Sequence, residues 1–145
     1  MNYSINNGVL MKKVLILCTG NSCRSIIAEA LINKELGKFG IKAFSAGSNP
    51  SGYVNENAKK VLKKYGAWDE RYYSKTIKEI EKESPFDLVI TVCNSAKKAC
   101  PIFAGAKKQL HLGFEDPDSK PYEAFEKTYM LMQKELLSLI KKVLL

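Results

Sequence analysis

Short, mostly apolar runs alternate along this chain with longer segments whose apolar residues recur every three or four positions. The runs cover residues 13–17, 41–46 and 86–92, and their length and apolar or β-branched content predict buried strands, while residues 108–112 are predicted as a fourth strand. The longer segments predict helices over residues 25–38, 54–65, 76–82 and from about 121 to the C-terminus. Strands that alternate with helices are typical of an α/β fold, so we expect a single-domain, four-stranded parallel sheet with helices on both faces.

Residues that can carry chemistry follow three of the predicted strands. Cys18 comes directly after the first strand, Cys93 directly after the third, and Asp116 shortly after the fourth. Ligands of parallel sheets bind where the carboxyl ends of the strands meet. We therefore expect these three side chains to open on the same edge of the sheet.

The segment between the first strand and the first helix has the features of an oxyanion-binding loop. A strand-to-helix turn has unpaired backbone N–H groups and faces the positive end of the helix dipole, so it favours an anion. Arg24 could grip two oxygens of a tetrahedral anion, and Asn21 tolerates a left-handed backbone. Ser25 stands where the N-cap of the helix is expected, and the same electrostatic field would lower the pKa of the Cys18 thiol. The pattern predicts Cys18 as a nucleophile beneath an anion bound by Thr19, Gly20, Asn21, Ser22, Cys23, Arg24 and Ser25.

Length, composition and charge set the broad class of the protein. With 145 residues, 46% of them hydrophobic and 26% charged, the chain has the size of one globular domain. We place that domain at residues 12–145 and expect residues 1–11 to be a flexible tail, with Met11 as an alternative start. No run approaches the roughly 20 apolar residues that span a bilayer, and the first ten residues lack the apolar core of a signal peptide, so we expect a cytoplasmic protein with no membrane partner. The net charge is +8, but the lysines are scattered in pairs without interleaved aromatic residues, so we expect no nucleic-acid partner.

The number and spacing of the cysteines indicate which kind of cysteine site the chain forms. Four cysteines in a reducing compartment indicate catalysis or metal binding rather than structural disulfides. Six residues separate Cys93 from Cys100, which suits neither a zinc knuckle nor a thioredoxin-type motif, so we expect no metal site. The layout favours a redox relay, in which one thiol attacks an adduct on Cys18 and a third thiol resolves the product.

The chain resembles the low-molecular-weight protein tyrosine phosphatase family, and more closely its thioredoxin-coupled arsenate reductases, in the motif Cys18-Thr19-Gly20-Asn21-Ser22-Cys23-Arg24-Ser25. The stretches 44–47 and 111–117 are similar as well, and the resemblance runs over nearly the whole chain. It implies that arsenate is the substrate, Cys18 the nucleophile and Asp116 the general acid. It further implies that Cys93 and Cys100 form the redox pair, that thioredoxin is the reductant, that no cofactor is needed and that the role is arsenic detoxification by a monomer.

Two departures from the family pattern leave alternatives open. Some of these reductases hold a monovalent cation with residues like Asn21, Glu29 and Ser45, but Lys78 stands where a further acid is expected, so we expect no potassium. Phosphatases of this fold usually follow the Asp-Pro pair with aromatic residues that wall a deep pocket, whereas residues 118–120 here are small and polar. The alternative function is a small tyrosine phosphatase that uses only Cys18, Arg24 and Asp116.

Overall fold

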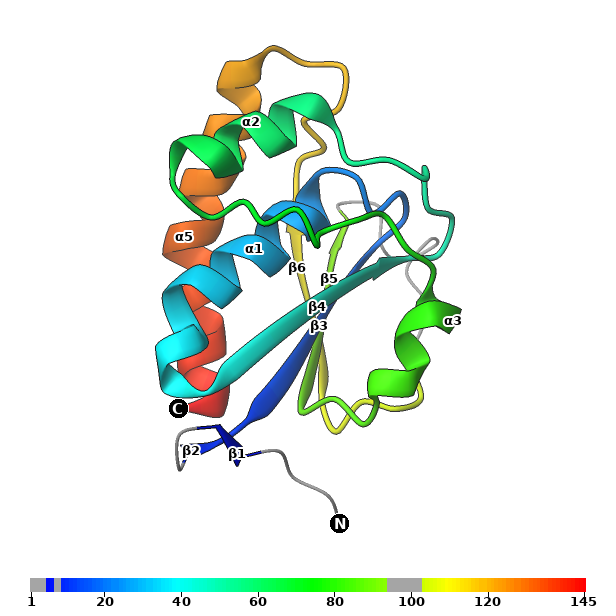
Figure 1. The fold of residues 1–145 in the computed structure, drawn as a ribbon, viewed down its shortest axis with the longest axis vertical. Coiled ribbons are helices and arrows are strands. Elements are labelled where there is room, and N and C mark those ends of the chain that lie inside the picture. The colour runs from blue at the N-terminus through cyan, green and yellow to red at the C-terminus, as the bar shows by residue number, and fades with distance from the viewer. Residues whose placement is uncertain (1–4, 7–8, 94–102) are drawn as a thin grey trace.

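The fold is built on a parallel sheet that we describe from a computed structural model, in which residues 5–6, 9–93 and 103–145 are placed well enough to describe. Four strands in the order β4-β3-β5-β6 form this sheet (Figure 1). All three strand pairs are parallel, with Ile16 opposite Ser45 on β4 and opposite Ile90 on β5. The strands are β3 (Lys12–Cys18), β4 (Ile41–Gly47), β5 (Leu88–Cys93) and β6 (Gln109–Phe114).

Helices cover both faces of the sheet. The helices α1, α2 and α5 lie together on one face, while α3 lies on the other (Figure 1). Their bounds are Arg24–Leu36 for α1, Glu56–Lys64 for α2, Ile77–Ile80 for α3 and Tyr122–Leu144 for α5. Short 3₁₀ turns at Gly37–Phe39 and Glu81–Glu83 extend α1 and α3. The predicted α/β architecture is therefore confirmed.

Each face of the sheet has its own hydrophobic core. On the first face α1 is buried along most of its length, and the apolar stripe of α5 packs on it through Phe125, Tyr129 and Met132. The second core is smaller, with Phe86 at its centre between the rings of Phe44 and Phe103. Because the strands alternate their side chains between the faces, both cores anchor the same strands, which fixes where the loops at their carboxyl ends begin.

The predicted element boundaries agree to within a few residues, with two informative differences. Ser25 was expected to cap α1, but the helix begins at Arg24, its N-cap position is Cys23, and Ser25 is fully buried inside the first turn. The strand β6 runs on to Phe114, two residues past the predicted end, because Phe114 pairs with Cys93 after an irregularity in the register. The acidic segment Glu115-Asp116 therefore follows the last residue of β6 directly.

Ahead of the main sheet, β1 (Ile5–Asn6) and β2 (Val9–Leu10) pair antiparallel with each other. They precede β3 directly and lie within the segment expected to be a tail. Within the described ranges, no helix has both the length and the apolar content that crossing a membrane requires.

Candidate active site

The backbone between β3 and α1 wraps into a tight loop that begins at Cys18. Asn21 has a positive φ of 46°, which is the left-handed conformation predicted for it. The carbonyls of Thr19 and Gly20 accept backbone hydrogen bonds from Asn49 (2.9 Å) and Ser51 (2.9 Å) in the segment after β4. With these carbonyls held outward, the loop N–H groups are left for the sulfur and for a ligand.

Cys18 lies at the floor of this loop and is 5% exposed. Burial raises the pKa of its thiol above the ordinary value, while the charge of Arg24 and the N–H groups of Thr19 and Gly20 act in the opposite direction. The predicted lowering of this pKa is therefore wrong for the anion-free loop, because desolvation of the thiolate outweighs the nearby positive charge.

Arg24 joins the loop to the segment that follows β6. Its Nη1 donates a hydrogen bond to the carbonyl of Phe114 at 3.0 Å, and its Nη2 lies 3.4 Å from Oδ2 of Asp116. The guanidinium is largely buried, whereas the Asp116 side chain is 48% exposed. The structure thus brings Cys18 and Asp116 together at one edge of the sheet, as their positions after the strands indicated, and Arg24 joins them from the start of α1.

These residues enclose a cavity of about 250 Å³, lined by Cys18, Thr19, Gly20, Asn21, Ser22, Cys23, Arg24, Ser51, Tyr53, Asp116 and Asp118. Its size suits a small anion held by backbone and guanidinium groups. Ser51, Tyr53 and Asp118 come from loops with no distinctive motif, so the sequence did not point to them. Asn55, the N-cap of α2, donates to Oδ1 of Asp118 at 3.1 Å and so ties the two loops together over the cavity.

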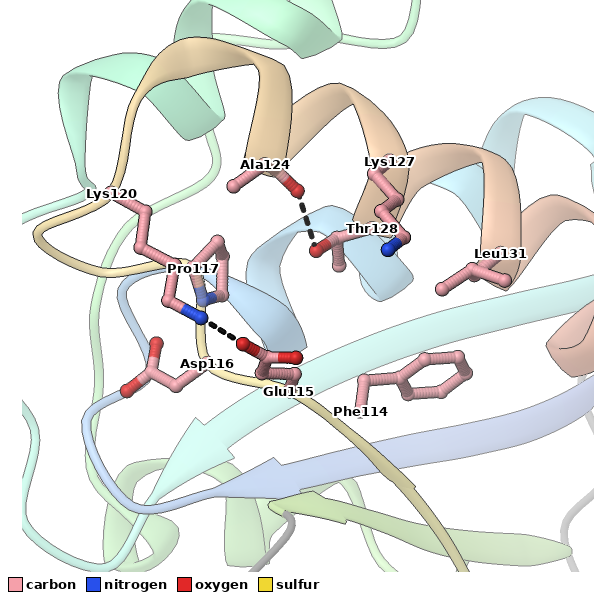
Figure 2. Close-up of a pocket in the computed structure, with 9 residues that line it drawn as sticks. All are labelled: Phe114, Glu115, Asp116, Pro117, Lys120, Ala124, Lys127, Thr128 and Leu131. Atoms are coloured by element: carbon pink, nitrogen blue, oxygen red, sulfur yellow. Dashed lines mark hydrogen bonds and ion pairs between the residues drawn. The ribbon is translucent and has the colours of Figure 1, made fainter.

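A second hollow of about 300 Å³ lies on the other side of the acidic loop, against α5 (Figure 2). There Glu115 pairs with Lys120, and Leu131 lines the far wall. Figure 2 shows the Asp116 carboxylate on the opposite side of this loop, toward the turn between β3 and α1. Of the two neighbouring acids, only Asp116 lines the cavity above Cys18.

The other cysteines differ in their state. Cys23 is free and buried, and burial raises the pKa of its thiol to about 12. Cys93 is buried at the end of β5 and is disulfide-bonded. Cys100, expected as its redox partner, lies outside the described residues. Leu17 pairs with Thr91, so Cys18 and Cys93 stand one and two residues beyond that pair on adjacent strands.

A buried polar network lies beneath the loop where a cation site was considered. Ser45 donates to Glu29 at 2.5 Å, and Asn21 donates to Ser45 at 2.9 Å. The ammonium beside Glu29 belongs to Lys75, at 3.8 Å, and not to Lys78, which is exposed on α3. The cation in this network therefore comes from a residue three positions before Lys78. In the part of the chain that the structure describes, no group of three or more acidic, histidine or cysteine side chains could hold a metal ion.

The family model for the low molecular weight phosphotyrosine protein phosphatase matches residues 13–144. An arsenate reductase of Staphylococcus epidermidis is 38% identical over 80% of this chain and 86% of its own. Another, from Halalkalibacterium halodurans, is 42% identical over 73% of this chain and 74% of its own.

Solved structures with a similar fold include both arsenate reductases and tyrosine phosphatases. An arsenate reductase in its phosphate-binding state superposes with a TM-score of 0.75 at 27% identity, covering 92% of this chain and 99% of that one. A low molecular weight protein tyrosine phosphatase from T. tengcongensis superposes with a TM-score of 0.70 at 28% identity, covering 90% of this chain and 99% of that one. The fold is therefore shared by reductases and phosphatases, and the choice between them depends on residues outside the common loop.

Proposed function

The chain belongs to the low-molecular-weight phosphotyrosine protein phosphatase family, and we propose that it is an arsenate reductase that works by a three-cysteine relay. The observation that carries this proposal is the state of Cys93. A cysteine beside the anion loop that is already disulfide-bonded has no role in phosphate-ester hydrolysis, but it is the product that a thiol relay leaves behind. The relatives named arsenate reductase support the same choice.

The first step is formation of an adduct on Cys18. Arsenate binds in the loop with Arg24 neutralising its charge, and Cys18 sulfur forms a bond to arsenic while one arsenic–oxygen bond breaks. The departing oxygen leaves as water, with Asp116 delivering the proton that it needs. The Cys18 thiol loses its proton in the same step, and this proton replaces the one that Asp116 gave up. A thiol that still carries its proton is consistent with the raised pKa of Cys18.

The second step is the reduction. The Cys93 thiolate attacks the sulfur of Cys18, and the electron pair of the sulfur–arsenic bond passes to arsenic. Arsenic(V) becomes arsenic(III) and leaves as arsenite, while the two thiols are oxidised to a Cys18–Cys93 disulfide. Cys100 then displaces Cys18 and forms a disulfide with Cys93. A thioredoxin supplies the two electrons that reduce this bond and start the next cycle.

The test is arsenate-dependent NADPH consumption with thioredoxin and thioredoxin reductase. We expect continuous consumption by the parent, none by Cys18→Ser, and about one arsenite per enzyme followed by a stall for Cys100→Ser. Sustained turnover of Cys100→Ser with thioredoxin would count against the relay.

The phosphatase alternative is favoured by one observation. Tyr53 lines the anion cavity and is 61% exposed, so an aromatic ring stands at the mouth even though residues 118–120 are polar. Hydrolysis of an aryl phosphate by the parent and by both Cys93→Ser and Cys100→Ser, without arsenate-dependent NADPH consumption, would establish that function instead.

A further inference from the structure

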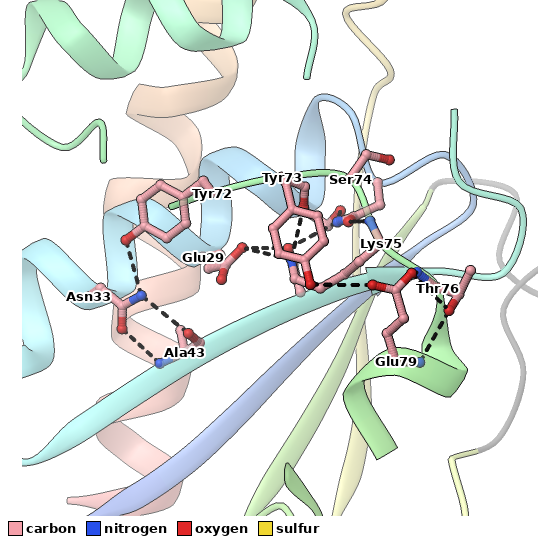
Figure 3. Close-up of polar contacts among 12 residues, drawn as sticks. Glu29, Asn33, Ala43, Tyr72, Tyr73, Ser74, Lys75, Thr76 and Glu79 are labelled. Carbon is pink, nitrogen blue, oxygen red and sulfur yellow. Dashed lines mark hydrogen bonds and ion pairs between the residues drawn. The ribbon is translucent and has the colours of Figure 1, made fainter. Parts of the chain in front are cut away.

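A buried ion pair lies beneath the oxyanion loop and has no part in the proposed chemistry. Lys75 is 7% exposed and Glu29 6% exposed, and Lys75 Nζ lies 3.8 Å from Oε1 of Glu29 (Figure 3). The same ammonium donates to the carbonyl of Tyr73 at 2.9 Å and lies 4.6 Å from the centre of its ring. Burying two charges is costly, so such a pair is poor evidence of a role in stability alone.

The pair is connected to the loop by two routes. In the first route, Glu29 accepts a hydrogen bond from Ser45, whose hydroxyl accepts one from Nδ2 of Asn21. In the second, the backbone N–H of Lys75 donates to Oδ1 of the same Asn21 at 2.8 Å. Lys75 thus reaches both ends of the Asn21 side-chain amide, Oδ1 through its own backbone N–H and Nδ2 through Glu29 and Ser45. Ser25 accepts a second hydrogen bond from Nδ2 at 2.7 Å.

Asn21 is the residue on which the shape of the loop depends. Its left-handed backbone turns the chain so that successive N–H groups can face the cavity, and its side chain is 1% exposed. A left-handed conformation is unfavourable for a residue with a Cβ, so it persists only where the surroundings hold it. The amide contacts at both ends of the Asn21 side chain supply that restraint.

The two charges depend on each other. Burial raises the pKa of Glu29 to about 7, while Lys75, the Ser45 hydroxyl and the more distant Lys42 act to lower it. Burial likewise lowers the pKa of Lys75, and the charges of Glu29 and Glu79 oppose this change. Loss of the Lys75 charge would therefore leave Glu29 more readily protonated and a weaker hydrogen-bond acceptor for Ser45.

We propose that Lys75 is a positioning residue for the oxyanion loop, a cation tethered to the chain that orders Glu29, Ser45 and Asn21 so that the loop is held open for the anion. The inference rests on the proposed function only in requiring that the loop bind a tetrahedral oxyanion. It makes Lys75 responsible for anion affinity although its ammonium does not line the cavity.

The first experiment measures the binding of inorganic phosphate by titration calorimetry, which does not depend on turnover. We expect Lys75→Met to weaken phosphate binding by about tenfold or more, the range typical of groups that orient ligand-binding residues. Lys78→Met removes an equal charge from an exposed position and is expected to bind phosphate like the parent. Equal affinity of Lys75→Met and the parent would overturn the inference and leave the proposed function intact. Failure of the parent itself to bind phosphate would overturn both.

The second experiment separates positioning by a cation from packing alone. Lys75→Ala removes the ammonium and its stem, and we expect ammonium chloride to restore phosphate affinity toward that of the parent. Choline chloride at the same ionic strength supplies a cation too large for the space and is expected to have no effect. If the two salts act alike on Lys75→Ala, the charge of Lys75 has no positioning role.

A double variant provides a test that remains valid if either single variant misfolds. Glu29→Gln/Lys75→Met removes both buried charges, so neither is left without its partner. We expect its phosphate affinity to be no lower than that of Lys75→Met, because the two residues act through one another. Additive losses from Glu29→Gln and Lys75→Met would show that they act independently and would overturn the inference.

Discussion

The guanidinium of Arg24, at the start of α1, lies 3.4 Å from the carboxylate of Asp116, in the loop before α5. Arg24 is held on its other side by the carbonyl of Phe114, whereas Asp116 is half exposed and can turn toward a ligand. Both side chains line the cavity at whose floor Cys18 lies. In the proposed mechanism, an entering oxyanion takes over the guanidinium, and the Asp116 carboxyl group then protonates the departing oxygen.

This arrangement predicts that Asp116→Asn separates chemistry from binding. The amide cannot deliver a proton, so turnover with arsenate should fall by about 10²- to 10⁴-fold, the usual contribution of a general acid. Phosphate affinity should stay the same or rise, because a negative charge is removed from the mouth of the cavity. Steady-state rates and phosphate titration measure the two effects. Glu115→Gln is the control, since Glu115 pairs with Lys120 away from the cavity, and an equal loss of turnover in it would contradict the assignment.

The pKa of Cys18 predicts how its alkylation depends on pH. Iodoacetamide reacts with the thiolate, and burial raises the pKa of this thiol above its ordinary value of 9.0, so the thiolate fraction at pH 7 is below that of a free cysteine. The alkylation rate of the anion-free protein should therefore climb throughout the range from pH 7 to 9. Cys23 should react more slowly than Cys18 over the same pH range, because burial raises the pKa of its thiol to about 12. Mass spectrometry of each cysteine follows both rates, and a plateau for Cys18 below pH 7 would show that Arg24 and the loop amides outweigh burial.

The shape of the loop can be tested sterically at Gly47, the last residue of β4. A Cβ built at this position would lie 2.5 Å from the carbonyl oxygen of Thr19 and 3.0 Å from Cβ of Asn21, so the loop would have to move. Gly47→Ala should lower the free energy of unfolding by about 1–3 kcal/mol, as overpacking typically does, and should abolish phosphate binding. Denaturant unfolding and titration provide the readouts. Gly37→Ala is matched to it, because nothing lies within 4 Å of a Cβ there, and it should be neutral or slightly stabilising.

Tyr129 predicts a stabilising substitution in the core. Its hydroxyl is buried and has no hydrogen-bond partner among the described residues, so Tyr129→Phe should leave stability unchanged or raise it by about 1–3 kcal/mol. Tyr65 stacks on it with ring centres 4.5 Å apart, but its hydroxyl donates to Glu126 at 2.7 Å. Tyr65→Phe should therefore be neutral or destabilising. Thermal unfolding of the two variants compares them, and a clear loss of stability in Tyr129→Phe would reveal a partner for that hydroxyl.

Much of the architecture and the centre of the site were determined locally by the sequence. The apolar runs predict β3, β4 and β5 because these strands are largely buried on both faces, whereas the edge strand β6 is only partly buried. The helical spacing predicts α2 and α5 because each presents one apolar stripe to the core. The left-handed turn at Asn21 was predictable because it depends on the chemistry of one residue. The meeting of Cys18 and Asp116 followed from the rule that loops at the carboxyl ends of parallel strands share an edge, and Arg24 joins them from the first turn of α1.

Other features were decided only when distant segments packed together. Whether Lys75 or Lys78 reaches Glu29 depends on how the segment before α3 crosses the end of β4, which no spacing in the sequence reveals. The pKa of Cys18 is raised and not lowered because burial by several elements outweighs the charge of Arg24. The sequence shows the charge but not the burial. Tyr53 reaches the cavity from a loop without a motif. Charge, periodicity and turn chemistry are local properties of the chain, whereas desolvation and long-range side-chain contacts exist only in the folded structure.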